Sequence, residues 1–330
     1  MKRKQLPIPA KINHHLSWFT CSGFTLLIII TILPALMTGC GQSQSSNTPR
    51  SGIVATIFPL YDLSKNITGD SIPTHLILPP GRSPHEYELT PSDRLQLRTA
   101  KFLIMTGGGV DSWIVKAAVE EEKHGLIIID LYQLEGGERL LAHEHEDEDS
   151  TASADKPLNP HQWLVPRAAE DFVRKLTETL AAQYPDQSQS FQPHLQDVLN
   201  QLNTIDNDYR EQIRGIKDRR MITFHDAFDP LAQEYGLDVV ATIYRVESQQ
   251  LTPADMTRLK HHINDGVRAV FAEPQFESGS LRQLGNQITI RTLDPLGGRT
   301  SPPGYLTYYE MMESNLKALV AGLKDNQGNQ

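Results

Sequence analysis

From residue 53 onward, short apolar runs alternate with longer stretches of helical periodicity, and this alternation restricts the fold more than any other feature. Apolar runs of four or five residues between helical stretches are typical of parallel strands connected by crossover helices. Four candidate strands fall in each half of the chain: Ile53 to Ile57, His75 to Leu78, Phe102 to Met105, Leu126 to Asp130, Met221 to Phe224, Val239 to Ile243, Ala269 to Ala272 and Thr289 to Leu293. We therefore expect an α/β protein of two similar lobes, each with a central parallel sheet. Sites are expected at the carboxyl ends of the strands and in the cleft between the lobes.

A long helix is expected between the two groups of strands. Apolar residues recur at spacings of three or four, which places them on one face of a helix: Phe191, Leu195, Val198, Leu202, Ile205, Tyr209, Ile213 and Ile216. A helix over residues 187–217 would be on the order of 45 Å long at 1.5 Å per residue. It would connect a lobe at residues 52–186 with a lobe at residues 218–330, and its rigidity would restrict hinge closure. The alternative is an ordinary long core helix within one domain.

The first forty residues have the pattern of a targeting segment. A basic start precedes the apolar run Phe24 to Met37, which is shorter than the roughly 20 residues that a spanning helix needs. We interpret residues 1–40 as a signal peptide, with an uncleaved anchor as the alternative. The end of this segment resembles a bacterial lipobox, which implies a lipid on Cys40, and residues 41–51 would then form a flexible tether. The predicted location is the periplasm or the outer face of the cytoplasmic membrane.

Net charge and cysteine content limit the possible partners and ligands. The chain has a net charge of -9 at pH 7, and loss of the targeting segment, whose charged residues are all Lys and Arg, would make it more acidic. Such a surface repels nucleic acid. Both cysteines, Cys21 and Cys40, lie in the targeting segment. A metal site in the folded part must therefore use imidazole and carboxylate ligands, and cysteine nucleophile chemistry is excluded there.

A segment of unusual composition lies at residues 142–156. His143 and His145 alternate with carboxylates, and Ser, Thr, Ala and Asp follow, which is typical of a disordered acidic loop. Two interpretations are open. His143 and His145 would bind metal with low affinity as an accessory capture site, or the segment is a plain solvated loop.

Three other histidines occupy positions that suit a metal site. His85 and His161 each follow a proline in a predicted loop, and His225 follows a predicted strand. A rigid sheet can hold such loops so that the imidazoles face a cleft. Pro84 and Pro160 restrict the residues before their histidines, which lowers the entropy lost on metal binding. One such histidine alone would be read as structural or exposed, but three in matching contexts favour a metal site.

The motifs around these histidines resemble those of one family. In chain order they are Ala55-Thr56-Ile57-Phe58-Pro59-Leu60, Leu78-Pro79-Pro80-Gly81, Ser83-Pro84-His85-Glu86-Tyr87-Glu88, Pro160-His161-Gln162-Trp163-Leu164, Phe224-His225-Asp226-Ala227-Phe228 and Leu293-Asp294-Pro295-Leu296. Over about residues 52–322 the chain resembles the solute-binding proteins of zinc and manganese ABC importers, the ZnuA/TroA-like family. The resemblance implies two lobes joined by one long helix, with the metal between them. It also implies a receptor that is no enzyme and that delivers metal to an ABC permease and its ATPase, and we expect a monomer.

The resemblance implies roles for individual residues as well. His85, His161 and His225 match the family's ligand histidines, and Asp294 matches the carboxylate that completes or approaches the coordination sphere, with water as the alternative fourth ligand. The first two histidines would come from the first lobe, and His225 and Asp294 from the second. Three imidazoles with one oxygen ligand suit tetrahedral zinc, whereas manganese favours more oxygen ligands. Manganese-specific members of the family often have Glu at the position of His225. Zinc is therefore expected, with manganese or iron as the alternative.

The chain departs from the family pattern beside His161. The family usually has Asp-Pro-His and a second Asp after Trp-Leu, where this chain has Asn159 and Val165. We therefore expect His161 to be oriented differently, because a ligating imidazole normally donates its other N–H to a carboxylate or a carbonyl. Glu86 and Asp226, each adjacent to a ligand, are candidates for this outer hydrogen-bonding role. Glu273 follows a predicted strand and could face the same cleft, although a structural acid is the preferred interpretation.

Two other functions would use the same residues. In a zinc hydrolase, the histidines and a carboxylate would hold an activated water, with Glu86 as the base. The chain lacks the His-Glu-x-x-His motif of such enzymes, which favours a protein without catalytic activity. A metal-binding surface adhesin lipoprotein, a role assigned to some members of the family, would share the site. Gly107-Gly108-Gly109 lacks the pattern of a phosphate-binding loop and is interpreted as a tight strand-to-helix turn.

Overall fold

The computed structural model describes residues 49–137, 158–243, 252–275, 288–298 and 307–325. The predicted signal peptide, most of the tether and the acidic segment with His143 and His145 lie outside these residues. Among the helices of the described part, none is long and apolar enough to cross a membrane.

The first lobe is built on a parallel sheet with the strand order β2-β1-β3-β4. The strands are β1 (Ile53–Ala55), β2 (Thr74–Leu76), β3 (Phe102–Met105) and β4 (Ile127–Asp130). Alternate residues of β1 and β3 face opposite sides of the sheet, as the two-residue period of a strand requires. Val54 and Leu103 pack in a core with α2 (Pro91–Thr99) and α3 (Ser112–Glu122). Ile53 and Phe102 pack on the other side, in a larger core.

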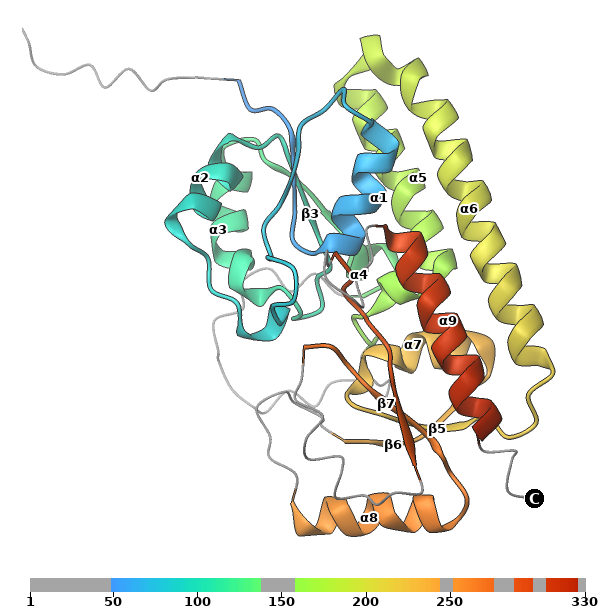
Figure 1. Cartoon of the computed structure of the whole chain (residues 1–330). Helices are drawn as coiled ribbons and strands as arrows, with labels where there is room; N and C mark the ends of the chain where they lie inside the picture. Colours follow the sequence, from blue (N-terminus) through green and yellow to red (C-terminus); the bar gives the residue numbers. More distant parts are fainter. Residues whose placement is uncertain (1–48, 138–157, 244–251, 276–287, 299–306, 326–330) are drawn as a thin grey trace, which may run out of the picture. The chain divides into compact units, whose positions relative to one another are not determined.

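In the first lobe, α1 (Phe58–Thr68), α5 (Pro166–Gln183) and the single turn α4 (Leu131–Leu134) contribute residues to this larger core (Figure 1). Short 3-10 helices interrupt the loops: η2 (Pro84–Glu86), η3 (Gln162–Leu164) and η4 (Pro185–Gln187). Local signals explain where helices begin. At α2, Thr90 and Asp93 form a capping box and Pro91 occupies the first turn, where its missing N–H costs nothing.

The second lobe repeats this architecture with the strand order β6-β5-β7-β8. Its strands are β5 (Arg220–Thr223), β6 (Asp238–Thr242), β7 (Ala269–Ala272) and β8 (Thr289–Thr292), and its helices are η5 (Asp226–Phe228), α7 (Asp229–Tyr235), α8 (Pro253–Asn264) and α9 (Tyr308–Asp325). Every strand pair in both sheets is parallel. The predicted fold class, two α/β lobes with parallel sheets, is confirmed.

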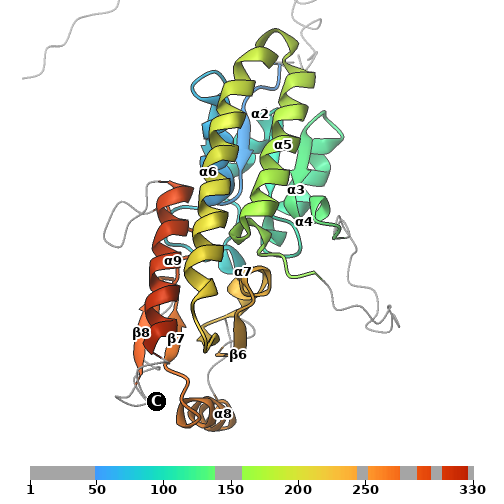
Figure 2. The same ribbon diagram turned by 90° about the vertical axis from the view of Figure 1, so that its right-hand side faces the viewer.

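One long helix, α6 (Ser188–Arg214), runs along both lobes. It packs against α1 and α5 of the first lobe and against α9 of the second, and Figure 2 shows it between α5 and α9. Its 27 residues correspond to about 40 Å. The apolar face of α6 belongs to a single hydrophobic core with residues from both lobes. Separation of the lobes along this face would expose apolar surface at a cost of about 25 cal/mol per Å², so the arrangement favours local adjustments over wide hinge opening.

Candidate metal centre

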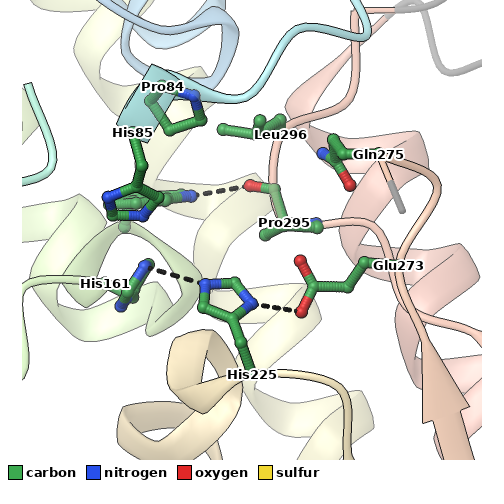
Figure 3. A pocket seen from close by; sticks show the side chains of 9 residues that line it. Pro84, His85, His161, His225, Glu273, Gln275, Pro295 and Leu296 are labelled. Carbon is green, nitrogen blue, oxygen red and sulfur yellow. Dashed lines mark hydrogen bonds and ion pairs between the residues drawn. The ribbon is translucent and has the colours of Figure 1, made fainter. Parts of the chain in front are cut away.

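Three histidines from three separate loops converge at the boundary between the lobes (Figure 3). His85 lies on η2, His161 directly precedes η3, and His225 lies between β5 and η5. One ring nitrogen of each histidine lies within 4.8 Å of the corresponding nitrogens of the other two. The imidazoles of His161 and His225 are buried, whereas that of His85 is exposed. The structure thus brings together the three histidines singled out from the sequence.

Asn159 fixes the orientation of His161. The Asn159 side-chain oxygen accepts hydrogen bonds from the His161 backbone N–H, at 3.0 Å, and from Nδ1 of the same residue, at 2.9 Å. A side-chain oxygen can only accept, so Nδ1 carries the proton of the neutral imidazole. The lone pair of Nε2 is then directed into the space between the histidines. Although Asn159 departs from the family pattern, it still supplies His161 with an oxygen acceptor.

Glu273 does the same for His225. This glutamate directly follows β7 and is buried, and its Oε1 lies 2.5 Å from Nδ1 of His225. A carboxylate acceptor places the proton on Nδ1, so the lone pair of this neutral imidazole lies on Nε2, the arrangement found in metal-binding histidines that are held by an acid. Glu273 therefore faces the cleft, the alternative to the preferred interpretation as a structural acid. Because β5 and β7 are neighbours in the sheet, the residues that follow them meet at the same edge.

The Nε2 atoms of the two buried histidines have the separation expected of two nitrogen ligands of one tetrahedral zinc ion. Nε2 of His161 and Nε2 of His225 lie 3.4 Å apart. Two nitrogens that are each about 2.0 to 2.1 Å from one zinc ion, at a tetrahedral angle, lie about 3.3 to 3.4 Å from each other. This separation is compatible with one shared cation.

Electrostatics favour the neutral form of His161. Burial lowers the pKa of His161 well below its usual value, and the nearby His225 and His85 lower it further. Histidine binds a metal ion only when it is neutral. A protein at neutral pH therefore presents His161 ready to bind, without the need to displace a proton.

The space between the histidines is small. The cavity volume is about 10 Å³, roughly the space that one water molecule needs. Residues of both lobes line it: Pro84, His85, His161, Trp163, His225, Glu273, Gln275, Pro295 and Leu296. Trp163 closes one side and donates from Nε1 to the carbonyl oxygen of Pro295, at 2.7 Å, across the lobe boundary. Such a cavity accommodates a single ion but no organic substrate.

A glycine turn allows the His161 loop its position. Gly108 has a φ of 57°, and a Cβ atom there would lie 2.5 Å from Cβ of Pro160 and 2.8 Å from the ring of Tyr132. A side chain at this position would both strain the backbone and displace Pro160. The Gly107-Gly108-Gly109 turn after β3 thus lets the loop with His161 approach the sheet.

Asp294, the predicted fourth ligand, lies near the centre but does not line the cavity. The residue is fully buried, and its Oδ1 accepts hydrogen bonds from the backbone N–H groups of Leu296 and Gly297, each at 3.0 Å. Its backbone is held by the side chain of Asn315. Oδ2 is buried without a hydrogen-bond partner among the described residues.

The structure places the other predicted residues outside the cavity. The Glu86 side chain is exposed, and Asp226 lines a different pocket, beside β6 and Arg258 of α8. Asp226 contributes its backbone carbonyl oxygen to a hydrogen bond with Asn159. The acceptors that contact the buried imidazoles are Asn159 and Glu273. His143 and His145 lie outside the described residues.

Comparison with known proteins identifies related sequences. The family described as zinc-uptake complex component A, periplasmic (ZnuA), matches residues 53–322. The zinc-binding lipoprotein AdcA of Streptococcus pneumoniae is 25% identical over 303 residues, which covers 89% of this chain and 60% of AdcA. The high-affinity zinc uptake system protein ZnuA of Bacillus subtilis is 27% identical over 315 residues, which covers 90% of this chain and 97% of that protein. The chain therefore spans about three fifths of the length of AdcA.

Solved structures share the fold. The periplasmic zinc-binding protein TroA from Treponema pallidum has a TM-score of 0.68 at 19% identity and covers 83% of this chain and 99% of TroA. A manganese-bound periplasmic metal-binding protein from Candidatus Liberibacter asiaticus has a TM-score of 0.69 at 16% identity, with coverage of 83% and 100%. A mutant of the laminin-binding adhesin Lmb from Streptococcus agalactiae has a TM-score of 0.70 at 19% identity, with coverage of 83% and 99%. At these identities the likeness concerns the fold alone.

Proposed function

The chain belongs to the ZnuA family, the periplasmic component A of zinc-uptake complexes. On this premise, we propose that the protein is an extracytoplasmic receptor that captures one zinc ion and delivers it to a membrane importer. Members of this family are solute-binding receptors and not enzymes, as predicted for this chain. The observation that carries the proposal is the pair of Nε2 atoms of His161 and His225, 3.4 Å apart. Both imidazoles donate their other N–H to an oxygen, so both lone pairs face the same point.

We assign His85, His161 and His225 as the ligands. His161 and His225 form a buried pair, and the exposed His85 closes over the ion from η2. The fourth position belongs to Asp294 or to water. Asp294 supports the first alternative through its buried Oδ2, which has no hydrogen-bond partner among the described residues. The small cavity supports the second, because water fills a coordination position without any movement of the chain.

The donor set favours zinc over manganese or iron. Three imidazole nitrogens suit a tetrahedral zinc site, whereas manganese prefers oxygen ligands and a higher coordination number. Glu273 is engaged with Nδ1 of His225, which supports a role in orienting that imidazole and not one as an oxygen ligand. Manganese is the alternative cargo, because the affinity of a site for divalent first-row transition metals does not by itself select one of them.

Release is proposed to proceed through the exposed ligand. Hydrogen bonds to Asn159 and Glu273 hold His161 and His225, and the two lobes share one core across α6. The η2 turn with His85 lies on the surface, and its displacement would leave the ion with two protein nitrogens. An ABC permease that contacts this turn would therefore weaken binding without opening the whole protein, while its ATPase supplies the energy.

Location and assembly follow from the same proposal. Residues 1–40 would act as an export signal, and a lipid on Cys40 would attach the mature chain to the outer face of the membrane. The receptor is proposed to work as a monomer. Export is consistent with the periplasmic family description, and the lipid anchor with the lipoprotein name of AdcA.

Elemental analysis and competitive titration of purified protein test this function. We expect one zinc ion per chain and a preference for zinc when manganese competes. A protein that binds neither metal at the histidine site, or that binds manganese more tightly than zinc, would refute the proposed cargo.

A further inference from the structure

We propose that Asn159 is a positioning residue that links the two halves of the metal centre. Its side-chain oxygen accepts from the backbone N–H and from Nδ1 of His161. Its side-chain nitrogen donates to the backbone carbonyl of Asp226, at 2.9 Å. His161 belongs to the first lobe, and Asp226 directly follows His225 in the second. One amide thus contacts both loops that hold the buried ligands, and the inference rests on the proposed function of these histidines.

The two roles of Asn159 require both ends of an amide. Its oxygen faces two donors of His161, and its nitrogen faces a carbonyl acceptor, so the orientation of the amide group is determined by its partners. An aspartate in this position would still accept from His161. It could not donate to Asp226, and its charged oxygen would face the oxygen of that carbonyl. Asparagine therefore combines ligand orientation with a cross-lobe hydrogen bond that aspartate cannot make.

The position of the cross-lobe bond gives it a consequence for metal binding. A second hydrogen bond between the lobes, from Trp163 to Pro295, lies in the wall of the cavity. The Asn159 bond instead joins the loops of the ligands themselves. It restrains the distance between His161 and His225 before the ion arrives, and a centre that is held in its binding geometry loses less entropy when it binds.

The two buried imidazoles have different acceptors. His225 donates to the carboxylate of Glu273, and His161 donates to the neutral amide of Asn159. A carboxylate partner makes an imidazole a stronger metal ligand than a neutral partner does. Asn159 therefore moderates the strength of His161 while it maintains the link between the loops, a compromise that suits a carrier which must also release its ion.

Two substitutions separate these roles. Asn159→Ala removes both hydrogen bonds, and Asn159→Asp removes only the bond to Asp226. Asn207→Asp, on the exposed surface of α6, controls for the added negative charge. Zinc affinity is measured by competition with a chelator at pH 7.5. Hydrogen exchange of the backbone amides in residues 224–231 is measured in the metal-free proteins, so this second readout does not depend on zinc binding.

We expect Asn159→Ala to weaken zinc binding by about 10- to 100-fold, the usual effect of losing an outer partner of a ligand. Asn159→Asp should bind zinc at least as tightly as the wild type, because the carboxylate makes His161 a stronger ligand and this effect outweighs the lost link between the loops. Both variants should exchange about 2- to 10-fold faster over residues 224–231, which corresponds to the loss of one hydrogen bond, and Asn207→Asp should behave as the wild type.

The outcomes are distinguishable from a failure of the proposed function. A wild-type protein that binds no zinc would refute the function but would leave the exchange result interpretable. Unchanged exchange in both Asn159 variants would overturn the cross-lobe link. Zinc affinity that falls equally in Asn159→Asp and Asn159→Ala, or that stays at the wild-type value in Asn159→Ala, would overturn the role in orienting His161.

Discussion

Nε2 of His161 faces Nε2 of His225 at 3.4 Å, and each of these histidines belongs to a different lobe. Two lone pairs this close repel each other unless a proton or a metal ion lies between them. The fold tolerates the contact because Asn159 and Glu273 hold the opposite ring nitrogens.

Removal of any one ligand should weaken zinc binding strongly. We expect His85→Ala, His161→Ala and His225→Ala each to raise the dissociation constant for zinc by at least about 100-fold, the upper end of the effect of losing an outer partner. Chelator competition measures the change. His124→Ala, an exposed histidine after α3, is the control. An affinity within a few-fold of the wild type in all three variants would refute the ligand assignment.

Glu273 should act through His225. Glu273→Gln keeps an oxygen acceptor but loses the charge, so we expect zinc affinity to fall about 10-fold. Glu273→Ala loses the acceptor altogether, and a fall of about 100-fold is expected. Zinc titration of both variants shows whether their affinities follow this order. If Glu273→Ala bound zinc as tightly as the wild type, the carboxylate would have no role in the metal centre.

Asp62, which lies at the boundary between the lobes, should make the folding stability of the protein depend on pH. This buried carboxylate of α1 accepts a hydrogen bond from the backbone N–H of Tyr308 on α9, at 2.9 Å. Burial raises the pKa of Asp62 from 3.8 to about 6, although hydrogen bonds from Tyr308 and Asn66 oppose the shift. The folded state then binds more protons than the unfolded state between these values. The contribution of Asp62 to stability is therefore complete below pH 3.8 and is lost as the pH rises through about 6.

Asp62→Asn does not titrate, so it should gain stability relative to the wild type as the pH rises. The gain between pH 4 and pH 7.5 should be roughly 2 kcal/mol, somewhat less than the full shift at 1.36 kcal/mol per pKa unit, because pH 4 already lies above the unfolded pKa. Urea unfolding at the two pH values measures it, with the exposed Asp197→Asn as the control. A difference in stability that does not change with pH would show that Asp62 titrates normally.

The acidic segment should bind additional ions weakly if His143 and His145 take part in capture. Deletion of residues 142–155 should then leave one tightly bound zinc ion and remove the weakly bound ones. Equilibrium dialysis at increasing zinc concentration measures both classes, and growth at scarce zinc measures uptake. Unchanged stoichiometry together with unchanged uptake would indicate a plain solvated loop.

Much of the fold and part of the centre could be predicted from the sequence. Strands that are buried on both faces appear as apolar runs, and β3 and β7 occupy the predicted residues 102–105 and 269–272. The long helix is shorter than the predicted range of residues 187–217 but has the predicted apolar face. His225 could be placed because it follows an apolar strand, and the carboxyl ends of parallel strands gather at one edge.

The outer contacts of the centre could not be predicted in the same way. The bond from Asn159 to Asp226 depends on how two lobes pack, and no local pattern encodes this. The position of Glu273 directly after β7 could be predicted from the sequence. Its contact with His225 could not, because it depends on β5 and β7 being adjacent in the sheet. Asp294 follows the strand β8 as expected, yet its Oδ1 is engaged by two backbone N–H groups of its own loop.

X-ray absorption at the zinc edge tests the central claim most directly. For protein loaded with one equivalent of zinc, we predict a four-coordinate site with three imidazole nitrogens and one oxygen at about 2.0 to 2.1 Å. The imidazole contribution should fall to two in His85→Ala. A wild-type site with fewer than three imidazoles, or a six-coordinate site with mostly oxygen ligands, would contradict the proposed zinc centre.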